Sequence, residues 1–209
     1  MEIFSLALGD FETNCYVVRA GRQAKECLII DPGFSAEGLL EFLNKEGLSV
    51  ERILLTHGHC DHIAGVKLLR EHYNGVPVAI SGEDAQMLTS GRKNLAWMTG
   101  SLLRVGEPDE ILNAGQEVGL EQVKFKVLST PGHTPGGMSF YSADQGVVFS
   151  GDTLFSGSIG RDDFPGGNRG VLLQSIREQL FVLPEETVVY PGHGPATTIG
   201  REKQSNPFF

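Results

Sequence analysis

Thr56-His57-Gly58-His59-Cys60-Asp61-His62 places four metal-type donor side chains within seven consecutive residues. The apolar run Arg52–Leu55 directly before this stretch predicts a short buried strand, so the donors are expected on a loop at the strand's carboxyl end. Four donors this close together would crowd a single small ion. The spacing therefore predicts two neighbouring ions, which in such sites lie about 3.5–4 Å apart and share a bridging oxygen ligand.

Three single donors further along the chain complete the set: His133, Asp152 and His193. Each follows a predicted strand, and glycine or proline stands beside each of them. Strands that end in tight turns hold side chains with the precision that coordination demands. Strand ends are also where α/β folds build their sites. Five of the six histidines of the chain are thus expected in one centre.

The donors are expected to divide between two ions. One ion takes His57, His59 and His133, the other takes Asp61, His62 and His193, and Asp152 bridges the two. Imidazole and carboxylate suit zinc, iron and manganese, so the expected cofactor is two divalent ions per chain, with zinc favoured. A closed structural zinc site is disfavoured, because such sites usually have four ligands rich in cysteine.

Composition limits the remaining classes. A chain of 209 residues with 40% hydrophobic residues predicts a single domain over residues 1–209. The net charge of −9, without a cluster of Lys and Arg, argues against nucleic acid and against an anionic membrane surface as partner. No apolar run predicts a membrane span or signal peptide, and the three scattered cysteines do not suggest disulfides, so a cytoplasmic location is expected.

Hydrophobic periodicity predicts strands and helices in alternation. A first helix is expected from an N-cap at Ser35 to a stop at Gly47, and a second one directly after the donor stretch. The stretch from Gly91 to Gly115 shows no clear periodicity, and a lid, a substrate wall and ordinary packing all remain open for it. The expected strands are Glu2–Leu8, Asn14–Arg19, Glu26–Ile30, Arg52–Leu55, Val76–Ile80, Gln122–Leu128, Met138–Tyr141, Gly146–Phe149 and Thr187–Tyr190, and the later helices are Gly82–Leu88 and Val171–Leu180.

The complete motif set resembles one family. T-H-G-H-x-D-H, followed by P-G-H-T-P-G, S-G-D and P-G-H-G-P, resembles the metallo-β-lactamase-fold hydrolases over nearly the whole chain. The loop Gly160–Pro165 and the tail Asn206–Phe208 are similar to the short bacterial glyoxalase II-like group of hydroxyacylglutathione hydrolases. The resemblance implies an αββα sandwich of two mixed sheets flanked by helices. True metallo-β-lactamases usually replace one of these histidines or add a zinc-binding cysteine, so antibiotic hydrolysis is not expected.

The resemblance implies a metal-dependent hydrolase of thioesters of the S-2-hydroxyacylglutathione type. Hydroxide bridging two ions would attack the carbonyl, while Asp61 and Asp152 act as catalytic residues that fix the ions and orient the nucleophile. A thiol with a pKa of about 8.5 departs as thiolate without a dedicated acid. Arg161 is the candidate substrate contact, with a structural ion pair to Asp162 or Asp163 as the alternative.

Two points remain open from the sequence. Full-length glyoxalase II enzymes carry a C-terminal helical extension that contributes to the glutathione site, whereas only Thr197–Phe209 remains near the end here, so the thiol part of the substrate is undetermined. A persulfide dioxygenase, which by resemblance would hold one iron through His57, His133 and Asp152, is the alternative activity. His72 is interpreted as an ordinary surface or packing residue, and Cys60 as a packing residue.

Overall fold

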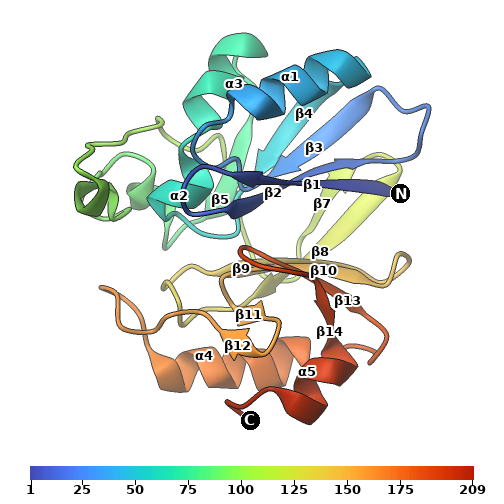
Figure 1. The fold of residues 1–209 in the computed structure, drawn as a ribbon, viewed down its shortest axis with the longest axis vertical. Coiled ribbons are helices and arrows are strands. Elements are labelled where there is room, and N and C mark those ends of the chain that lie inside the picture. Colours follow the sequence, from blue (N-terminus) through green and yellow to red (C-terminus); the bar gives the residue numbers. More distant parts are fainter.

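Two six-stranded sheets face each other in the computed structural model, which describes residues 1–209 (Figure 1). Helices α1 (Glu37–Glu46) and α3 (Val66–His72) cover the outer face of the first sheet, and α4 (Arg169–Ser175) and α5 (Ile199–Ser205) cover that of the second (Figure 1). This arrangement confirms the αββα sandwich of two mixed sheets flanked by helices that the motifs implied.

The first sheet has the strand order β1-β2-β3-β4-β5-β6. Its first three strands are antiparallel, and its last four run parallel to one another. The strands are β1 (Glu2–Leu8), β2 (Thr13–Arg19), β3 (Glu26–Ile30), β4 (Ser49–Leu54), β5 (Val78–Ser81) and β6 (Glu110–Leu112).

The second sheet has the order β14-β13-β10-β9-β8-β7, in which only β10 and β13 pair in parallel. A separate hairpin joins β11 (Leu154–Phe155) to β12 (Ser158–Ile159). The strands of the second sheet are β7 (Glu117–Leu120), β8 (Val123–Ser129), β9 (Met138–Ser142), β10 (Val147–Gly151), β13 (Val188–Pro191) and β14 (Thr197–Thr198).

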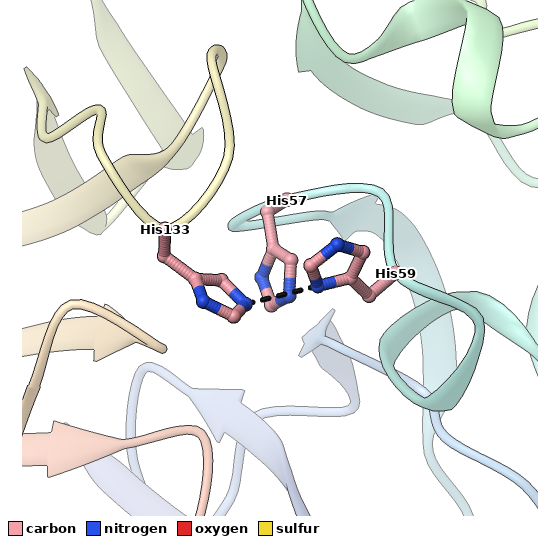
Figure 2. A group of neighbouring side chains, drawn as sticks. All are labelled: His57, His59 and His133. Atoms are coloured by element: carbon pink, nitrogen blue, oxygen red, sulfur yellow. Dashed lines mark hydrogen bonds between the residues drawn. The ribbon is translucent and has the colours of Figure 1, made fainter. Parts of the chain in front are cut away.

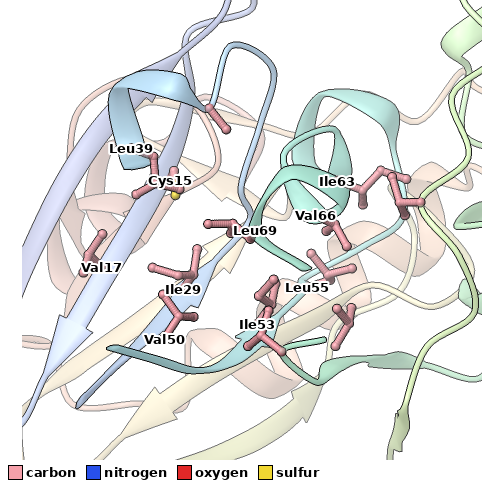
Figure 3. Close-up of a cluster of buried hydrophobic side chains, with 14 of the residues drawn as sticks. Cys15, Val17, Ile29, Leu39, Val50, Ile53, Leu55, Ile63, Val66 and Leu69 are labelled. Carbon is pink, nitrogen blue, oxygen red and sulfur yellow. The ribbon is translucent and has the colours of Figure 1, made fainter. Parts of the chain in front are cut away.

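The period-two alternation of the strands creates three apolar layers. In β4, Ile53 faces the helices above the first sheet, whereas Leu54 faces the second sheet. In β10, Phe149 faces the first sheet, whereas Val148 faces α4 and α5. Figure 3 shows the layer between the first sheet and its helices, with Ile53 among its labelled residues. Because both faces of each sheet are buried, the central strands are almost continuously apolar.

Several boundaries differ from the sequence expectation. The N-cap at Ser35 was wrong: Ser35 has φ +56°, and α1 begins at Glu37 without a side-chain cap. The stop at Gly47 is confirmed, since Gly47 takes the left-handed conformation at the end of α1. The helix after the donors is divided into α2 (Cys60–Ile63) and α3. The division occurs at Gly65, where a Cβ would lie 2.7 Å from the Cβ of Ala36.

Other elements are shorter than expected or were not predicted. Only a 3₁₀ turn, η1 (Ala85–Met87), forms where a helix near Gly82–Leu88 was expected, and a second turn, η2, spans Ala96–Thr99. The helix expected over Val171–Leu180 is present as α4, which is followed directly by a π-helical segment, η3 (Ile176–Leu180). Strands β6, β7, β11, β12 and β14 had no clear sequence signal. No helix combines the length and apolar character needed to cross a membrane.

The strand directions determine where function can reside. Strands β3 and β4 of the first sheet are parallel, as are β10 and β13 of the second. The hydroxyl of Tyr16 on β2 donates to the carbonyl of Pro191 at the end of β13 (2.6 Å), so the two sheets are joined at this edge. The loops that carry the expected donors leave from the carboxyl ends of β4, β8, β10 and β13.

The aromatic layer between the sheets generates a stability prediction. Phe149 is fully buried and its ring lies 5.0 Å from that of Tyr16 and 5.6 Å from that of Phe125. We expect Phe149→Ala to lower the free energy of unfolding by about 3–5 kcal/mol, because it leaves a cavity in this layer. Urea denaturation followed by circular dichroism measures the change. Val182→Ala, at a side chain that is 69% exposed, is the control and should change it by less than about 0.5 kcal/mol. Equal effects would contradict the assigned core.

Candidate metal centre

The fold brings both expected donor groups together. The donor atoms of His57, His59 and His133 all lie within 4.8 Å of one another, and Figure 2 shows their rings converging from two loops. The donor atoms of a second group, made up of Asp61, His62 and His193, lie within the same distance of each other. These are the two sets that the spacing predicted.

Asp152 lies between the two groups. One carboxylate oxygen is 3.4 Å from Nε2 of His62, and the other is 3.5 Å from Nε2 of His133 and 3.6 Å from Nε2 of His193. The carboxylate therefore reaches donors of both groups, as a bridging ligand must.

Backbone carbonyl groups orient two of the imidazole rings. Nδ1 of His133 donates to the carbonyl of Arg161 (2.7 Å), and Nδ1 of His193 donates to the carbonyl of Phe11 (3.0 Å). A carbonyl only accepts, so each Nδ1 carries a proton, and Nε2 is the nitrogen of each ring that can bind a metal ion. This outer support is characteristic of histidines that bind metal ions.

Asp31 orients two further rings, and sequence reasoning did not identify it. Its carboxylate accepts from Nδ1 of His62 (2.9 Å) and from the backbone and hydroxyl of Thr56 (2.8 and 2.6 Å). Because the hydroxyl of Thr56 donates to Asp31, it can accept from Nδ1 of His57 at 3.1 Å. The only sequence signal was the position of Asp31 at the end of a strand, where Asp31-Pro32-Gly33 was interpreted as a turn.

The donor set fits divalent cations. Nε2 of His57 and Oδ1 of Asp152 are buried without a hydrogen-bond partner, which is costly unless another group binds them. Burial lowers the pKa of His57, and burial together with His133 lowers the pKa of His59 to about 3, so both rings are neutral ligands. Neutral imidazole and carboxylate oxygen are the donors that zinc, iron and manganese accept.

The carboxylates of the centre attract positive charge. Burial would raise the pKa of Asp152, but His62 overcomes this effect and holds the pKa below its ordinary value. Burial would lower the pKa of His62, but Asp61 and Asp152 raise it well above its ordinary value. The second donor group thus stabilises a cation in the form of a proton on His62. A divalent ion would supply that charge more effectively, because several donors can share it.

Glycine allows the donor loops to approach one another. At Gly192, beside His193, a Cβ would lie 2.2 Å from Oδ1 of Asp152. Gly151 has φ +50°, and a Cβ there would lie 2.3 Å from the hydroxyl oxygen of Thr56. Any side chain at either position would displace a donor or its support.

A second buried carboxylate, Asp84, joins the donor loops of the two sheets and was also missed. It accepts from the backbone of Gly58 (3.2 Å) in the first donor loop, and from the hydroxyl of Thr134 (2.7 Å) and the backbone of Gly136 (2.8 Å) in the loop after His133. The two loops therefore keep a fixed separation without any ligand. Nothing in the sequence around Asp84 distinguishes it from a surface acid.

A pocket of about 330 Å³ opens above the donors. Leu95, Met98 and Thr99 show that part of the unassigned stretch Gly91–Gly115 forms a wall of this pocket. The complete lining is Phe11, His59, Cys60, Asp61, Leu95, Met98, Thr99, His133, Asp152, Phe155, Arg161, Phe164 and His193.

The remaining sequence candidates are also placed. Arg161 lines the pocket, and its guanidinium pairs with Asp163 through two contacts (2.9 and 2.8 Å) while lying 4.0 Å from the centre of the Phe164 ring. The ion pair considered as an alternative for Arg161 is therefore present. Cys60 was expected to be a packing residue and is buried, but it also borders the pocket; burial raises its pKa to about 11, so its thiol stays protonated. His72 is exposed on α3, as expected.

Curated relatives with a named activity are similar over almost the whole chain. Probable metallo-hydrolase YqgX of Bacillus subtilis is 37% identical over 204 residues, which cover 97% of this chain and 95% of that protein. Hydroxyacylglutathione hydrolase GloC of Haemophilus influenzae is 38% identical over 210 residues, which cover 100% of this chain and 98% of that protein.

Solved structures are similar over almost the full length. BLEG-1, described as a B3 metallo-beta-lactamase, has a TM-score of 0.93 and 39% identity, covering 99% of both chains. TTHA1623 in a di-iron-bound form has a TM-score of 0.87 and 38% identity, covering 99% of this chain and 100% of that one. ETHE1 from Myxococcus xanthus has a TM-score of 0.79 and 30% identity, covering 99% of this chain and 84% of that one.

The family profile described as the Metallo-beta-lactamase superfamily matches residues 8–193, from the last residue of β1 to the last of the donors. With its αββα sandwich and its converging histidine and aspartate side chains, the chain belongs to the metallo-beta-lactamase superfamily.

Proposed function

We propose that this protein is a dinuclear metal-dependent thioester hydrolase that acts on S-2-hydroxyacylglutathione-type substrates, with zinc as the favoured metal. The observation that carries the proposal is the convergence of two complete donor groups at the base of a pocket large enough for an acyl group. The similarity to a hydroxyacylglutathione hydrolase over the full chain supports this substrate class. We further propose that the protein works in the cytoplasm on a small molecule, without a nucleic acid or membrane partner.

The donors named above would hold the ions, with Asp152 shared between them. When bound, two divalent ions supply a Lewis acid for the substrate carbonyl and a hydroxide nucleophile near neutral pH. Asp61 and Asp152 both face the pocket, with side chains 16% and 12% exposed. Neighbouring histidines hold the pKa of both carboxyl groups below the ordinary value, despite the opposing effect of burial. These carboxylates therefore stay ionised, and they can orient the nucleophile by accepting a hydrogen bond from it.

The pocket suits a substrate whose leaving group needs no acid. Apart from the proposed ligands, its titratable lining residues are Cys60 and Arg161. Neither is an effective proton donor near neutral pH, because burial raises the pKa of Cys60 and Asp163 raises that of Arg161. A thiol leaves as thiolate without protonation, unlike an amine. Phe155 and Phe164 give the pocket apolar walls that limit access of water.

The alternative dioxygenase would use one iron held by His57, His133 and Asp152. A single iron at these residues would leave the second donor group unused. Yet two members of that group are oriented by hydrogen bonds, His62 by Asp31 and His193 by the carbonyl of Phe11. The oriented second group favours the dinuclear hydrolase.

Metal content separates the two activities. We expect close to two divalent ions per chain by elemental analysis of protein purified without added metal, together with hydrolysis of S-lactoylglutathione without oxygen uptake. One iron per chain and oxygen consumption with glutathione persulfide would overturn the proposal. Nitrocefin hydrolysis is the control for a β-lactam substrate, which the similarity to a B3 metallo-beta-lactamase makes necessary.

Removal of a single proposed ligand should abolish turnover. We expect His59→Ala and Asp152→Ala to reduce S-lactoylglutathione hydrolysis to background and to lower the metal content, because each variant leaves an incomplete donor group. Most of the fold should survive, as judged by circular dichroism. His72→Ala, at the one histidine outside the centre, is the matched control. Near-normal hydrolysis by either ligand variant would show that the site is misassigned.

Asp31 should determine metal affinity without touching the ion. We expect Asp31→Asn to weaken metal binding about 10–100-fold in chelator competition, because the neutral amide supports the imidazole of His62 less strongly. Asparagine tolerates the φ of +52° at this position, so the backbone should be kept. Asp163→Asn, at an exposed carboxylate, is the control. Equal metal affinity in Asp31→Asn and wild type would exclude this positioning role.

A further inference from the structure

A second hollow lies beside the proposed active site and has no role in the mechanism above. We call it the cationic groove; it is lined by Arg92, Lys93, Trp97 and Pro165 and has a volume of about 780 Å³. Three of these residues belong to the stretch Gly91–Gly115, for which the sequence assigned no role.

Consecutive residues line the cationic groove and the active-site pocket at two places. Trp97 lines the groove and the next residue, Met98, lines the pocket. On the facing loop, Pro165 lines the groove and the preceding residue, Phe164, lines the pocket. A molecule whose acyl group lies in the pocket therefore has the groove next to its other end.

The segment that carries the groove is fixed to the metal loop. The carbonyl of buried Asn94 accepts from the backbone of Cys60 (2.8 Å), inside the donor stretch. The amide of Asn94 donates to the carbonyls of Met87 (2.9 Å) and Leu103 (3.1 Å). Leu95, which follows, has φ +66°, a conformation that persists only where surrounding contacts hold it. The backbone that carries Arg92 and Lys93 is thus attached to the donor loop through the adjacent residue Asn94.

The charge of the groove is available to a ligand. Neither Arg92 nor Lys93 has a carboxylate within 4.0 Å, whereas Arg161 in the pocket is neutralised by Asp163. The side-chain amide oxygen of Gln86, which accepts from the ammonium of Lys93, carries no charge. The lining of the groove therefore carries two positive charges on consecutive residues and no negative charge, in a chain with a net charge of −9. Beside them the indole of Trp97, 57% exposed, offers an apolar face.

We propose that the cationic groove binds the anionic portion of the thiol that carries the acyl group, with Arg92 and Lys93 as specificity-determining residues. The inference rests on the proposed function and identifies the substrate as an acyl thioester of an acidic thiol. The negative charge lies on the thiol side, several bonds from the sulfur atom. Carboxylates of a peptide thiol and phosphates of a nucleotide thiol share this chemistry, and the probes below distinguish them.

Trp97 reports on the groove directly, because it is the only tryptophan of the chain. Intrinsic fluorescence of the metal-loaded protein is titrated with three thioethers that cannot be hydrolysed: S-methylglutathione, S-methyl-coenzyme A and neutral S-methyl-N-acetylcysteamine. We expect one of the anionic thioethers to change the emission saturably and the neutral one to bind at least tenfold more weakly. Saturation with S-methylglutathione identifies carboxylates as the bound groups, and saturation with S-methyl-coenzyme A identifies phosphates.

The double variant Arg92→Gln/Lys93→Gln tests the two cations. We expect it to raise the Kd of the bound anionic thioether about tenfold and to reduce the dependence of Kd on salt, because exposed ion pairs are weakened by screening. Lys124→Gln/Lys126→Gln, which removes the same charge from exposed positions of β8, should leave the Kd unchanged. Equal weakening in both double variants, or equal binding of the neutral thioether by wild type, would overturn the assignment.

A kinetic measurement separates this inference from the proposed function. The ratio of kcat/KM for the lactoyl thioester of the preferred anionic thiol to that for S-lactoyl-N-acetylcysteamine should fall about tenfold in Arg92→Gln/Lys93→Gln. If wild type hydrolyses both thioesters and the variant keeps the same ratio, the hydrolase stands and the groove assignment fails. If no thioester is hydrolysed, the proposed function fails, whereas the fluorescence titration still decides whether the groove binds anionic thiols.

Discussion

The structure depends on the convergence of seven metal-type donors, four of them buried, in one shared space. Nitrogen and oxygen lone pairs that are removed from water need a hydrogen-bond donor or a cation as partner. Several such lone pairs close together are stable only around positive charge. His57 to His62 follow a strand of the first sheet, whereas His133, Asp152 and His193 follow strands of the second. The charge that satisfies the donors therefore also links the two sheets. A change in the angle between the sheets would separate the two halves of each donor group.

The supporting groups act on this same constraint. Asp31 holds His62 and, through Thr56, His57, while Asp84 fixes the distance between the donor loops of the two sheets. Both carboxylates are buried, and Asp31 has a positive φ. A buried carboxylate in a strained backbone is unfavourable on its own, and it persists here because several hydrogen bonds hold it. Much of the chain around the centre thus serves to orient ligands rather than to bind them.

The sequence made the donor loops and the central strands predictable for local reasons. The motif Thr56–His62 contains four metal-type donors within seven consecutive residues, so its function can be recognised locally. Runs such as Val147–Phe149 have the apolar character of a strand buried on both faces. Asp31 and Asp84 could not be recognised, because their partners lie 25 or more residues away and become neighbours only in the folded chain. The stretch Gly91–Gly115 lacks periodicity because hydrogen bonds of Asn94, rather than a repeating apolar face, determine its conformation.

The attachment of that stretch through Asn94 has an evolutionary consequence. The contacts of Asn94 are with main-chain atoms of Cys60, Met87 and Leu103, which any sequence provides. Exposed neighbours such as Trp97 and Leu102 can therefore be exchanged without moving the donors. Mutation at these positions can redirect the enzyme to a new substrate while its reactive centre stays intact. The fold thereby allows the metal-binding residues to be conserved while the residues that contact the substrate diversify.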